Sequence, residues 1–152
     1  MNAPAHLPDA LSKQRLRVWL RLLRATRYIE NEVREGLRIG HDTTLPRFDV
    51  LAMLDRSSGG LRMSELSAQL MVSNGNVTGI VERLVQDGLV ERVAVEGDRR
   101  ATRVRLTKQG VETFAAMAAE HETWVNGLLG NLDENDSADL IRLLQRIGKD
   151  KT

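Results

Sequence analysis

The stretch LVERVAVEGDRRATRVRLT, residues 89–107, decides the fold of this chain. Residues 102–106 alternate polar and apolar side chains, and residues 89–95 are rich in valine, as is typical of β-strands that are buried on one face. Between them, residues 96–101 open with Glu-Gly-Asp, a combination that favours a turn. The stretch therefore predicts a hairpin of two antiparallel strands, with four arginines in its loop and second strand.

Two short helices are predicted directly before the hairpin. Residues 61–70 and 73–88 place leucine, valine and isoleucine at helical spacing. Ser73 is a suitable N-cap for the second helix, and Gly88 lies where a glycine commonly ends one. Two helices joined by a tight turn form a helix-turn-helix, and the hairpin after them adds the wing of a winged helix.

Further helices are predicted on both sides of this unit. Residues 10–39 form a basic amphipathic helix, and the helix that begins at residue 45 has proline in its first turn. After the hairpin, a Gly-Asn break separates two more helices, and Asp133 caps the second of them. The first helix, at about 28 residues, is longer than the helices that a small domain usually covers, which indicates a partner helix.

Composition narrows the possible function classes. The chain has 152 residues, a formal net charge of +1 and no cysteine, which excludes disulfides, thiol redox sensing and a cysteine nucleophile. Its three histidines lack metal-ligand spacing, so we expect no metal and no cofactor. The first residues lack the apolar segment of a secretory signal, and no apolar run approaches the roughly 20 residues that span a bilayer. We therefore expect a cytoplasmic protein without a membrane partner.

The arginines of the hairpin indicate an anionic partner. Arg99 and Arg100 lie in the predicted loop, where a cationic tip suits the phosphates and the narrow minor groove of DNA. Asp98 is two residues from Arg100 and can pair with it to fix its direction. Arg103 and Arg105 alternate with apolar residues of the second strand, so they either contact phosphates or form a solvated face.

The helix predicted at residues 73–88 is expected to read the major groove of DNA. Its N-terminal part presents hydroxyl and amide side chains, namely Ser73, Asn74, Asn76 and Thr78. Asparagine can pair with adenine, and the threonine methyl group can contact the methyl group of thymine. The alternative for Asn74 and Asn76 is that they only cap the helix and shape the turn before it.

Two other function classes compete with DNA binding. An enzyme is disfavoured because the chain has no P-loop, no dinucleotide-binding glycine motif and neither the zinc-protease nor the serine-hydrolase motif. A winged helix used for protein contacts would need an apolar or acidic exposed face on the helix at residues 73–88, and it would not need a basic wing. The four arginines of the hairpin argue against that second class.

The wing and the helices before it resemble those of the MarR family of bacterial transcription regulators. The matching residues are Asp98, Arg100, Leu106 and Thr107 in the wing, Val72, Ser73, Val77, Thr78, Leu84, Gly88, Leu89 and Val90 before it, and LPRFDVL at residues 45–51. The resemblance covers residues 11–148. One departure is Gly79, where many relatives carry an arginine, so no operator preference is carried over from a relative.

The resemblance implies a homodimer that places two winged helices on a palindromic operator in double-stranded DNA. By the family pattern, Arg100 is the minor-groove arginine and Asp98 is its orienting partner. The implied domains are a flexible N-terminus (1–9), a winged helix-turn-helix (45–107) and a helical dimerisation region in two segments (10–44 and 108–150). The family mostly represses transcription, and an activator remains the alternative.

The family also often binds small aromatic acids in a crevice between the dimerisation region and the winged helix. This chain offers cations and aromatic rings for such an effector, namely Arg21, Arg24, Arg27, Tyr28 and Phe48. They suggest an aromatic carboxylate or its coenzyme A thioester. The alternative is that the rings belong to the core and the arginines are solvated. A further alternative is a regulator without a small-molecule effector.

Overall fold

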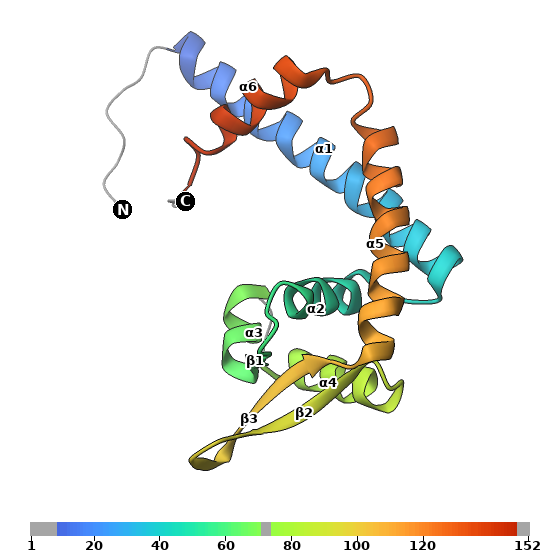
Figure 1. Cartoon of the computed structure of the whole chain (residues 1–152). Coiled ribbons are helices and arrows are strands. Elements are labelled where there is room, and N and C mark those ends of the chain that lie inside the picture. Colours follow the sequence, from blue (N-terminus) through green and yellow to red (C-terminus); the bar gives the residue numbers. More distant parts are fainter. Residues whose placement is uncertain (1–8, 71–73, 149–152) are drawn as a thin grey trace.

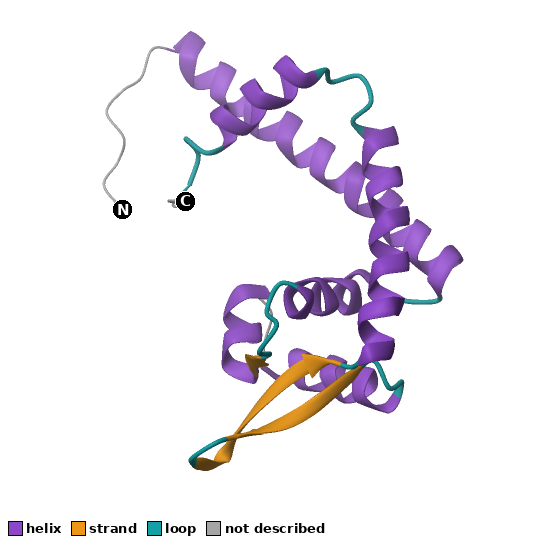
Figure 2. Ribbon diagram, viewed as in Figure 1, coloured by secondary structure: helices purple, strands orange, loops and turns teal. Residues whose placement is uncertain are grey.

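A computed structural model describes residues 9–70 and 74–148 of the chain. Its elements are α1 (Asp9–His41), α2 (Leu45–Asp55), β1 (Leu61–Arg62), α3 (Met63–Leu70), α4 (Asn74–Gln86), β2 (Val90–Val95), β3 (Asp98–Leu106), α5 (Lys108–Leu128) and α6 (Glu134–Leu144). The mainly α fold with a small sheet is confirmed (Figure 2). The predicted flexible N-terminus lies outside the described residues, except for Asp9, which begins α1.

The winged helix occupies one end of the molecule (Figure 1). There α2, α3 and α4 pack around the sheet, while α1 and α5 extend away from it and α6 lies beyond the far end of α5. The core of this end is built from one face of each helix and strand, and its fully buried members include Leu51, Leu66, Val77, Leu84 and Val104. From α1 only Val33 and Leu37 are buried, so the last turns of α1 alone are anchored in this core.

The predicted hairpin is confirmed as β2 and β3, and a third strand, β1, adds to it in the antiparallel order β1-β3-β2. Residues 61–62 were predicted as part of a helix, but they pair with β3, Leu61 opposite Val104 and Arg62 opposite Arg103. Two residues are too few to show an alternating pattern. Their conformation is set by pairing with a strand about forty residues later in the chain, which local periodicity does not reveal.

The tip of the wing also differs from the prediction. The turn is confined to residues 96–97, and β3 already begins at Asp98 instead of after residue 101. Val95 pairs with Asp98, whereas Ala94 pairs with Thr102, so residues 99–101 form a bulge with no counterpart on β2. A bulge of this kind bends and twists a strand. The predicted loop is therefore a short turn followed by an irregular strand that contains both tip arginines.

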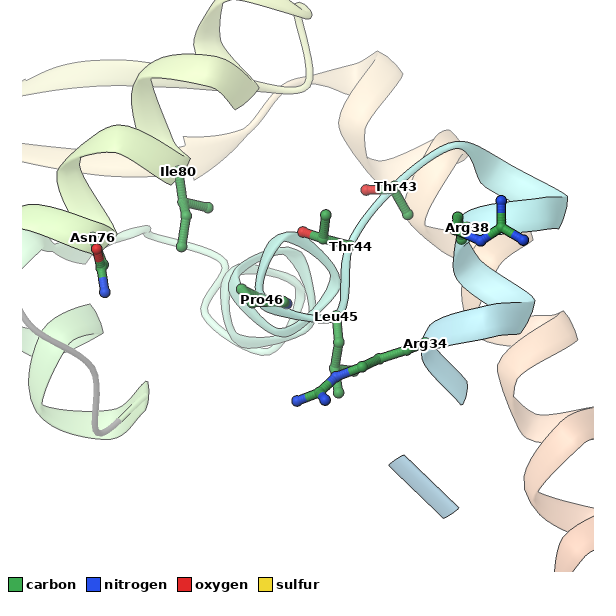
Figure 3. Close-up of a pocket in the computed structure, with 8 residues that line it drawn as sticks. All are labelled: Arg34, Arg38, Thr43, Thr44, Leu45, Pro46, Asn76 and Ile80. Carbon is green, nitrogen blue, oxygen red and sulfur yellow. The ribbon is translucent and has the colours of Figure 1, made fainter. Parts of the chain in front are cut away.

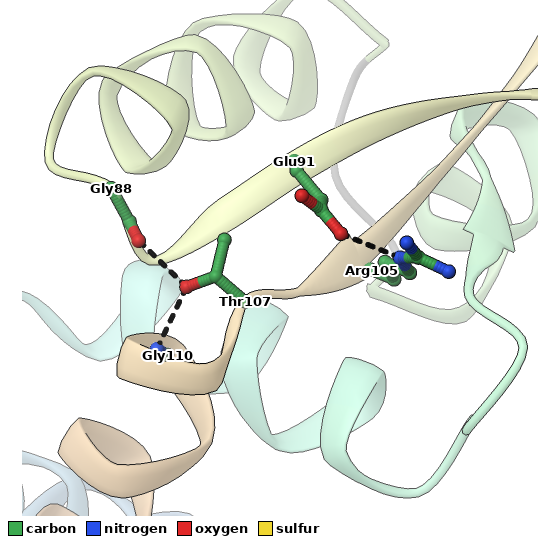
Figure 4. A network of polar contacts seen from close by, with 5 residues as sticks. All are labelled: Gly88, Glu91, Arg105, Thr107 and Gly110. Atoms are coloured by element: carbon green, nitrogen blue, oxygen red, sulfur yellow. Dashed lines mark hydrogen bonds and ion pairs between the residues drawn. The ribbon is translucent and has the colours of Figure 1, made fainter.

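Thr107 connects the base of the wing to α4 and α5 through hydrogen bonds of its side chain (Figure 4). Its hydroxyl donates to the carbonyl of Gly88 at 2.6 Å and accepts from the N–H of Gly110 at 2.9 Å, which makes it the N-cap of α5. Gly88 ends α4 with φ at +76°, as its position in the sequence predicts. The start of α5 and the end of α4 are thus joined through one side chain.

The far half of the molecule leaves apolar side chains uncovered. Asp133 caps α6 as predicted, with a reciprocal bond to Asp136, yet no residue of α6 is buried. The exposed apolar residues of this half include Leu16, Trp19 and Leu20 on α1 and Leu140, Ile141, Leu143, Leu144 and Ile147 on or after α6. A surface with this many exposed apolar groups is unusual for a monomer.

Candidate DNA-binding interface and effector cavity

Helix α4 presents one face to the core and the opposite face to solvent. Val77, Val81 and Leu84 are fully buried. At 100° per residue, the opposite face is centred on Gly79, Glu82 and Gln86, all of which are exposed. This exposed face lies on the outside of the winged helix, where a DNA groove could receive it.

The predicted reading residues lie on the two edges of this exposed face. Asn76 is on the edge nearer the start of α2, and Thr78 is on the other edge; both are exposed. Asn74 is the first residue of α4, and Ser73 lies outside the described residues. Between the edges, a Cβ on Gly79 would meet nothing within 4 Å, so the centre of the face is open.

The wing carries the other predicted DNA residues. Asp98 is exposed at the start of β3, and the backbone of Arg99 and Arg100 belongs to the bulge, while the structure describes nothing of their side chains. Arg103 is exposed beside Arg62 of β1, which makes this face of the sheet more basic. Arg105 is different: its Nε donates to Glu91 at 2.6 Å across the hairpin, so its charge already has a partner (Figure 4).

A cavity of about 540 Å³ lies between α1, the start of α2 and α4. Figure 3 shows Arg34 and Arg38 on the α1 side, Asn76 and Ile80 on the α4 side, and Thr44, Leu45 and Pro46 between them. Its lining is mostly apolar, with cations at one side, which is a combination that suits a small ligand with one anionic group.

Both arginines of this cavity already have carboxylate neighbours. Arg34 lies 3.8 Å from Glu30, and Arg38 donates to Glu35 at 2.5 and 3.0 Å. The hydrogen bond from Arg38 lowers the pKa of the Glu35 carboxyl. These pairs are exposed on the helix surface, so they are weak, and an anionic ligand would share the guanidinium groups with them.

The residues predicted to bind the effector do not line this cavity. Arg21, Arg24 and Arg27 are exposed on α1 and precede the segment that borders the cavity, and the Tyr28 side chain is 59% exposed. Phe48 is only 6% exposed, and its ring packs against the rings of Phe114 and His121, with centroid distances of 5.4 Å and 4.7 Å. The structure therefore brings Arg34 and Arg38, which the sequence analysis did not single out, to the crevice instead.

Polar contacts join the helices around the linker between α1 and α2. His41 Nε2 lies 2.5 Å from Glu120 Oε2, which ties the end of α1 to α5. Arg47 in the first turn of α2 forms an ion pair with Asp87, just after the end of α4. Burial raises the pKa of Asp49, although the nearby His121 opposes this shift. The contacts of His41 and Arg47 therefore join the end of α1 to α5 and the start of α2 to the residue just after α4.

The structure describes no group of histidine, aspartate or glutamate residues that could hold a metal ion within its two ranges. Over the same ranges, no helix is long and apolar enough to cross a membrane.

An exposed helix-turn-helix, a basic wing and helices with uncovered apolar faces define the class of winged-helix transcription regulators. Comparison with known proteins gives the family. A model of the MarR family matches residues 41–101. A MarR family regulator from Silicibacter pomeroyi, solved by crystallography, is 30% identical, with 93% of this chain and 96% of that chain covered and a TM-score of 0.76. The chain belongs to the MarR family, as the sequence predicted.

Two further comparisons bear on function. The transcriptional regulator BilQ from Clostridium symbiosum is 35% identical over 92 residues, which is 60% of this chain and 64% of BilQ. A mutant MarR from E. coli, solved in complex with operator DNA, is 25% identical, with 90% of this chain and 96% of that chain covered and a TM-score of 0.77. The chain spans only 61–64% of the length of the first curated relatives that it matches. Because these relatives are transcription regulators, the prediction that the chain is not an enzyme is confirmed.

Proposed function

We propose that this protein is a homodimeric transcription regulator that binds a palindromic operator and is released from it by a small anionic aromatic effector. The observation that carries the proposal is that a cavity of about 540 Å³ shares Asn76 and Ile80 with α4, the helix with an exposed reading face. A ligand in the cavity would therefore touch the DNA-reading helix directly. Release requires that the ligand binds the DNA-free protein more tightly than the DNA-bound protein.

In this proposal, residues 45–107 form the DNA-binding domain. The N-terminal part of α4, with Asn74, Asn76 and Thr78, enters the major groove, and the wing reaches the adjacent minor groove. Ser73, which lies outside the described residues, is proposed to contact DNA with them. Asp98 orients Arg100 in the minor groove, while Arg99 and Arg103 contact phosphates. The support is the exposure of Asn76, Thr78, Asp98 and Arg103 on one winged helix, and the similar fold of the relative that was solved with operator DNA.

Residues 10–44 and 108–150 form the proposed dimerisation region. The support is the set of exposed apolar side chains on α1 and α6. Charge is complementary too, because the first half of α1 is basic and the start of α6 is acidic, with Glu134, Asp136 and Asp139. A second copy of the chain would cover the apolar groups and pair these charges. A dimer bound at its operator would repress by blocking access of the polymerase to the promoter.

The DNA-binding part of the proposal is tested at Arg100. Arg100→Ala is expected to lower operator affinity by about tenfold or more, since a specific arginine contact contributes about 1–3 kcal/mol. Fluorescence anisotropy on a labelled operator duplex measures the change. Arg92→Ala, which removes the same charge from an exposed position on β2, is the control and should change affinity less. Equal affinities for Arg100→Ala and the wild type would mean that Arg100 does not contact DNA and would overturn its proposed place in the minor groove.

The effector part is tested by calorimetry with salicylate, benzoate and benzoyl-coenzyme A. We expect at least one of them to bind, and Arg38→Ala to weaken its binding about tenfold, because a charge-assisted hydrogen bond contributes about 1.5–3 kcal/mol. Arg27→Ala removes the same charge outside the cavity and should leave affinity unchanged. If Arg27→Ala weakened binding and Arg38→Ala did not, the effector would lie at the residues named from the sequence. No heat with any compound would favour a regulator without such an effector.

A further inference from the structure

A second groove lies beside α4, next to the effector cavity. Its volume is about 420 Å³, and its lining residues are Thr44, Arg47, Asn76, Gly79, Ile80 and Arg83. Two of the six are arginines and none is acidic; because Arg47 is paired with Asp87, Arg83 supplies the uncompensated positive charge of the groove. Two others, Asn76 and Gly79, belong to the exposed face of α4, so the groove is continuous with the proposed reading surface.

Arg83 is the cation of this groove that is available for a ligand. It lies one turn after Gly79 on α4, and its side chain is exposed. Among the residues that the structure describes, its guanidinium has no hydrogen-bond or ion-pair partner, whereas Arg34, Arg38, Arg47 and Arg105 all do. The charge of Arg83 is therefore not paired with another side chain in the described part of the chain.

Arg47 and the start of α2 form the opposite wall. The ion pair with Asp87 holds Arg47 in place, and its Nε is buried without a partner in the described part of the chain. Thr44 caps α2 by accepting from the N–H of Arg47 at 3.3 Å, which places the positive end of the helix dipole at the groove. Two guanidinium groups and a helix N-terminus are together suited to a phosphate group.

We propose that this groove binds a backbone phosphate of the DNA whose major groove receives α4, with Arg83 as the direct contact and Arg47 as its fixed neighbour. The proposal rests on the proposed docking of α4. Gly79 supports it, because the absence of a side chain there leaves the path from the base edges to the groove open. A phosphate held here would fix the register of α4 on the duplex without reading sequence.

Free phosphate or a carboxylate could also occupy such a groove. The continuity between the groove and the exposed face of α4 favours the DNA backbone, because the groove borders the face that is proposed to enter the major groove. The two sources differ in a measurable way. A DNA phosphate contact contributes to the salt dependence of DNA binding, whereas a site for a free anion binds inorganic phosphate in the absence of DNA.

The test compares Arg83→Ala with Arg56→Ala on two duplexes. Arg56 is an exposed arginine at the other end of α2, so Arg56→Ala removes the same charge at a position away from the groove. Anisotropy is measured over a range of salt concentrations with a duplex from upstream of the gene and with a scrambled duplex. For Arg83→Ala we expect weaker binding to both duplexes by a similar factor, and a salt slope lower by about 0.9 per subunit, or about 1.8 per dimer. Arg56→Ala should retain the wild-type slope.

Three results would overturn the phosphate site. The first is an unchanged salt slope of DNA binding for Arg83→Ala. The second is a loss of affinity confined to the upstream duplex, which would mean that Arg83 contacts bases. The third is binding of inorganic phosphate by the free protein that Arg83→Ala removes without changing the salt slope of DNA binding. Failure of the docking of α4 would be seen separately: Asn76→Ala would then leave the preference for the upstream duplex intact, whatever the result at Arg83.

Discussion

Leu144→Asp is expected to convert the protein from a dimer into monomers and to lower operator affinity by about a hundredfold or more. Leu144 is 41% exposed on α6, so the isolated chain loses little stability when it is replaced. In the proposed dimer the same position lies in an apolar interface, where an unpaired carboxylate is costly. Binding of two linked half-sites gains roughly 10²–10⁴ in affinity over one, and the monomer loses that gain.

Sedimentation velocity measures the association state, and anisotropy on an operator duplex measures the affinity. Ala68→Asp is the control, because Ala68 is exposed on α3, in the winged helix and outside the proposed dimerisation region. It introduces the same charge at an exposed apolar position and should leave the dimer intact. A wild-type protein that is monomeric at micromolar concentration would contradict the dimer proposal. A Leu144→Asp variant that remains dimeric would show that Leu144 of α6 is not in the dimer interface.

Gly110→Ala is expected to destabilise the folded protein by about 3 kcal/mol or more, because overpacking against an immobile neighbour is among the larger single-residue effects. An alanine Cβ would lie 1.9 Å from the carbonyl oxygen of Leu89 and 2.9 Å from its carbonyl carbon. Both are backbone atoms, and the same oxygen accepts from the N–H of Thr107 at 3.0 Å. Relief of the clash would therefore separate the base of the wing from α5.

Thermal and urea unfolding measure this effect, and a decrease of about 3 kcal/mol corresponds to a fall of roughly 10 °C in Tm for a chain of this size. Gly79→Ala is the control, since its Cβ would meet nothing within 4 Å. It should be neutral or stabilise α4 by up to about 1 kcal/mol, the difference in helix propensity. Equal stabilities for Gly110→Ala and the wild type would mean that α5 and the wing are not packed as described.

Most helices were predictable from sequence because their apolar residues recur at helical spacing, whether or not the isolated chain buries them. This spacing predicted residues 10–39, whereas proline in the first turn marked the start of α2 and a capping aspartate marked α6. Strand β1 was missed because it has two residues and is defined only by its pairing with β3. The shift of the hairpin turn to residues 96–97 was missed for a similar reason, since a bulge depends on register and not on residue type.

The candidate sites were predictable in part. The phase of the buried residues Val77, Val81 and Leu84 already places Asn76 and Thr78 on exposed edges of α4. The same phase places Arg83 on the same edge of α4 as Asn76, so the position of Arg83 could also be predicted from the helical spacing. The cavity was harder to predict, because Arg34 and Arg38 are distinguished from the earlier arginines of α1 only by their position opposite the start of α2 and α4. Tertiary packing of this kind leaves no local pattern.

Binding of a specific DNA sequence by α4 and the wing is tested by fluorescence anisotropy. Affinity is measured for a duplex from upstream of the gene and for a scrambled duplex of equal length, each at two salt concentrations. We expect tighter binding to the upstream duplex and a steep loss of affinity for both duplexes at the higher salt concentration. Equal, weak and salt-insensitive binding to both duplexes would contradict this expectation, and would favour a winged helix that contacts another protein.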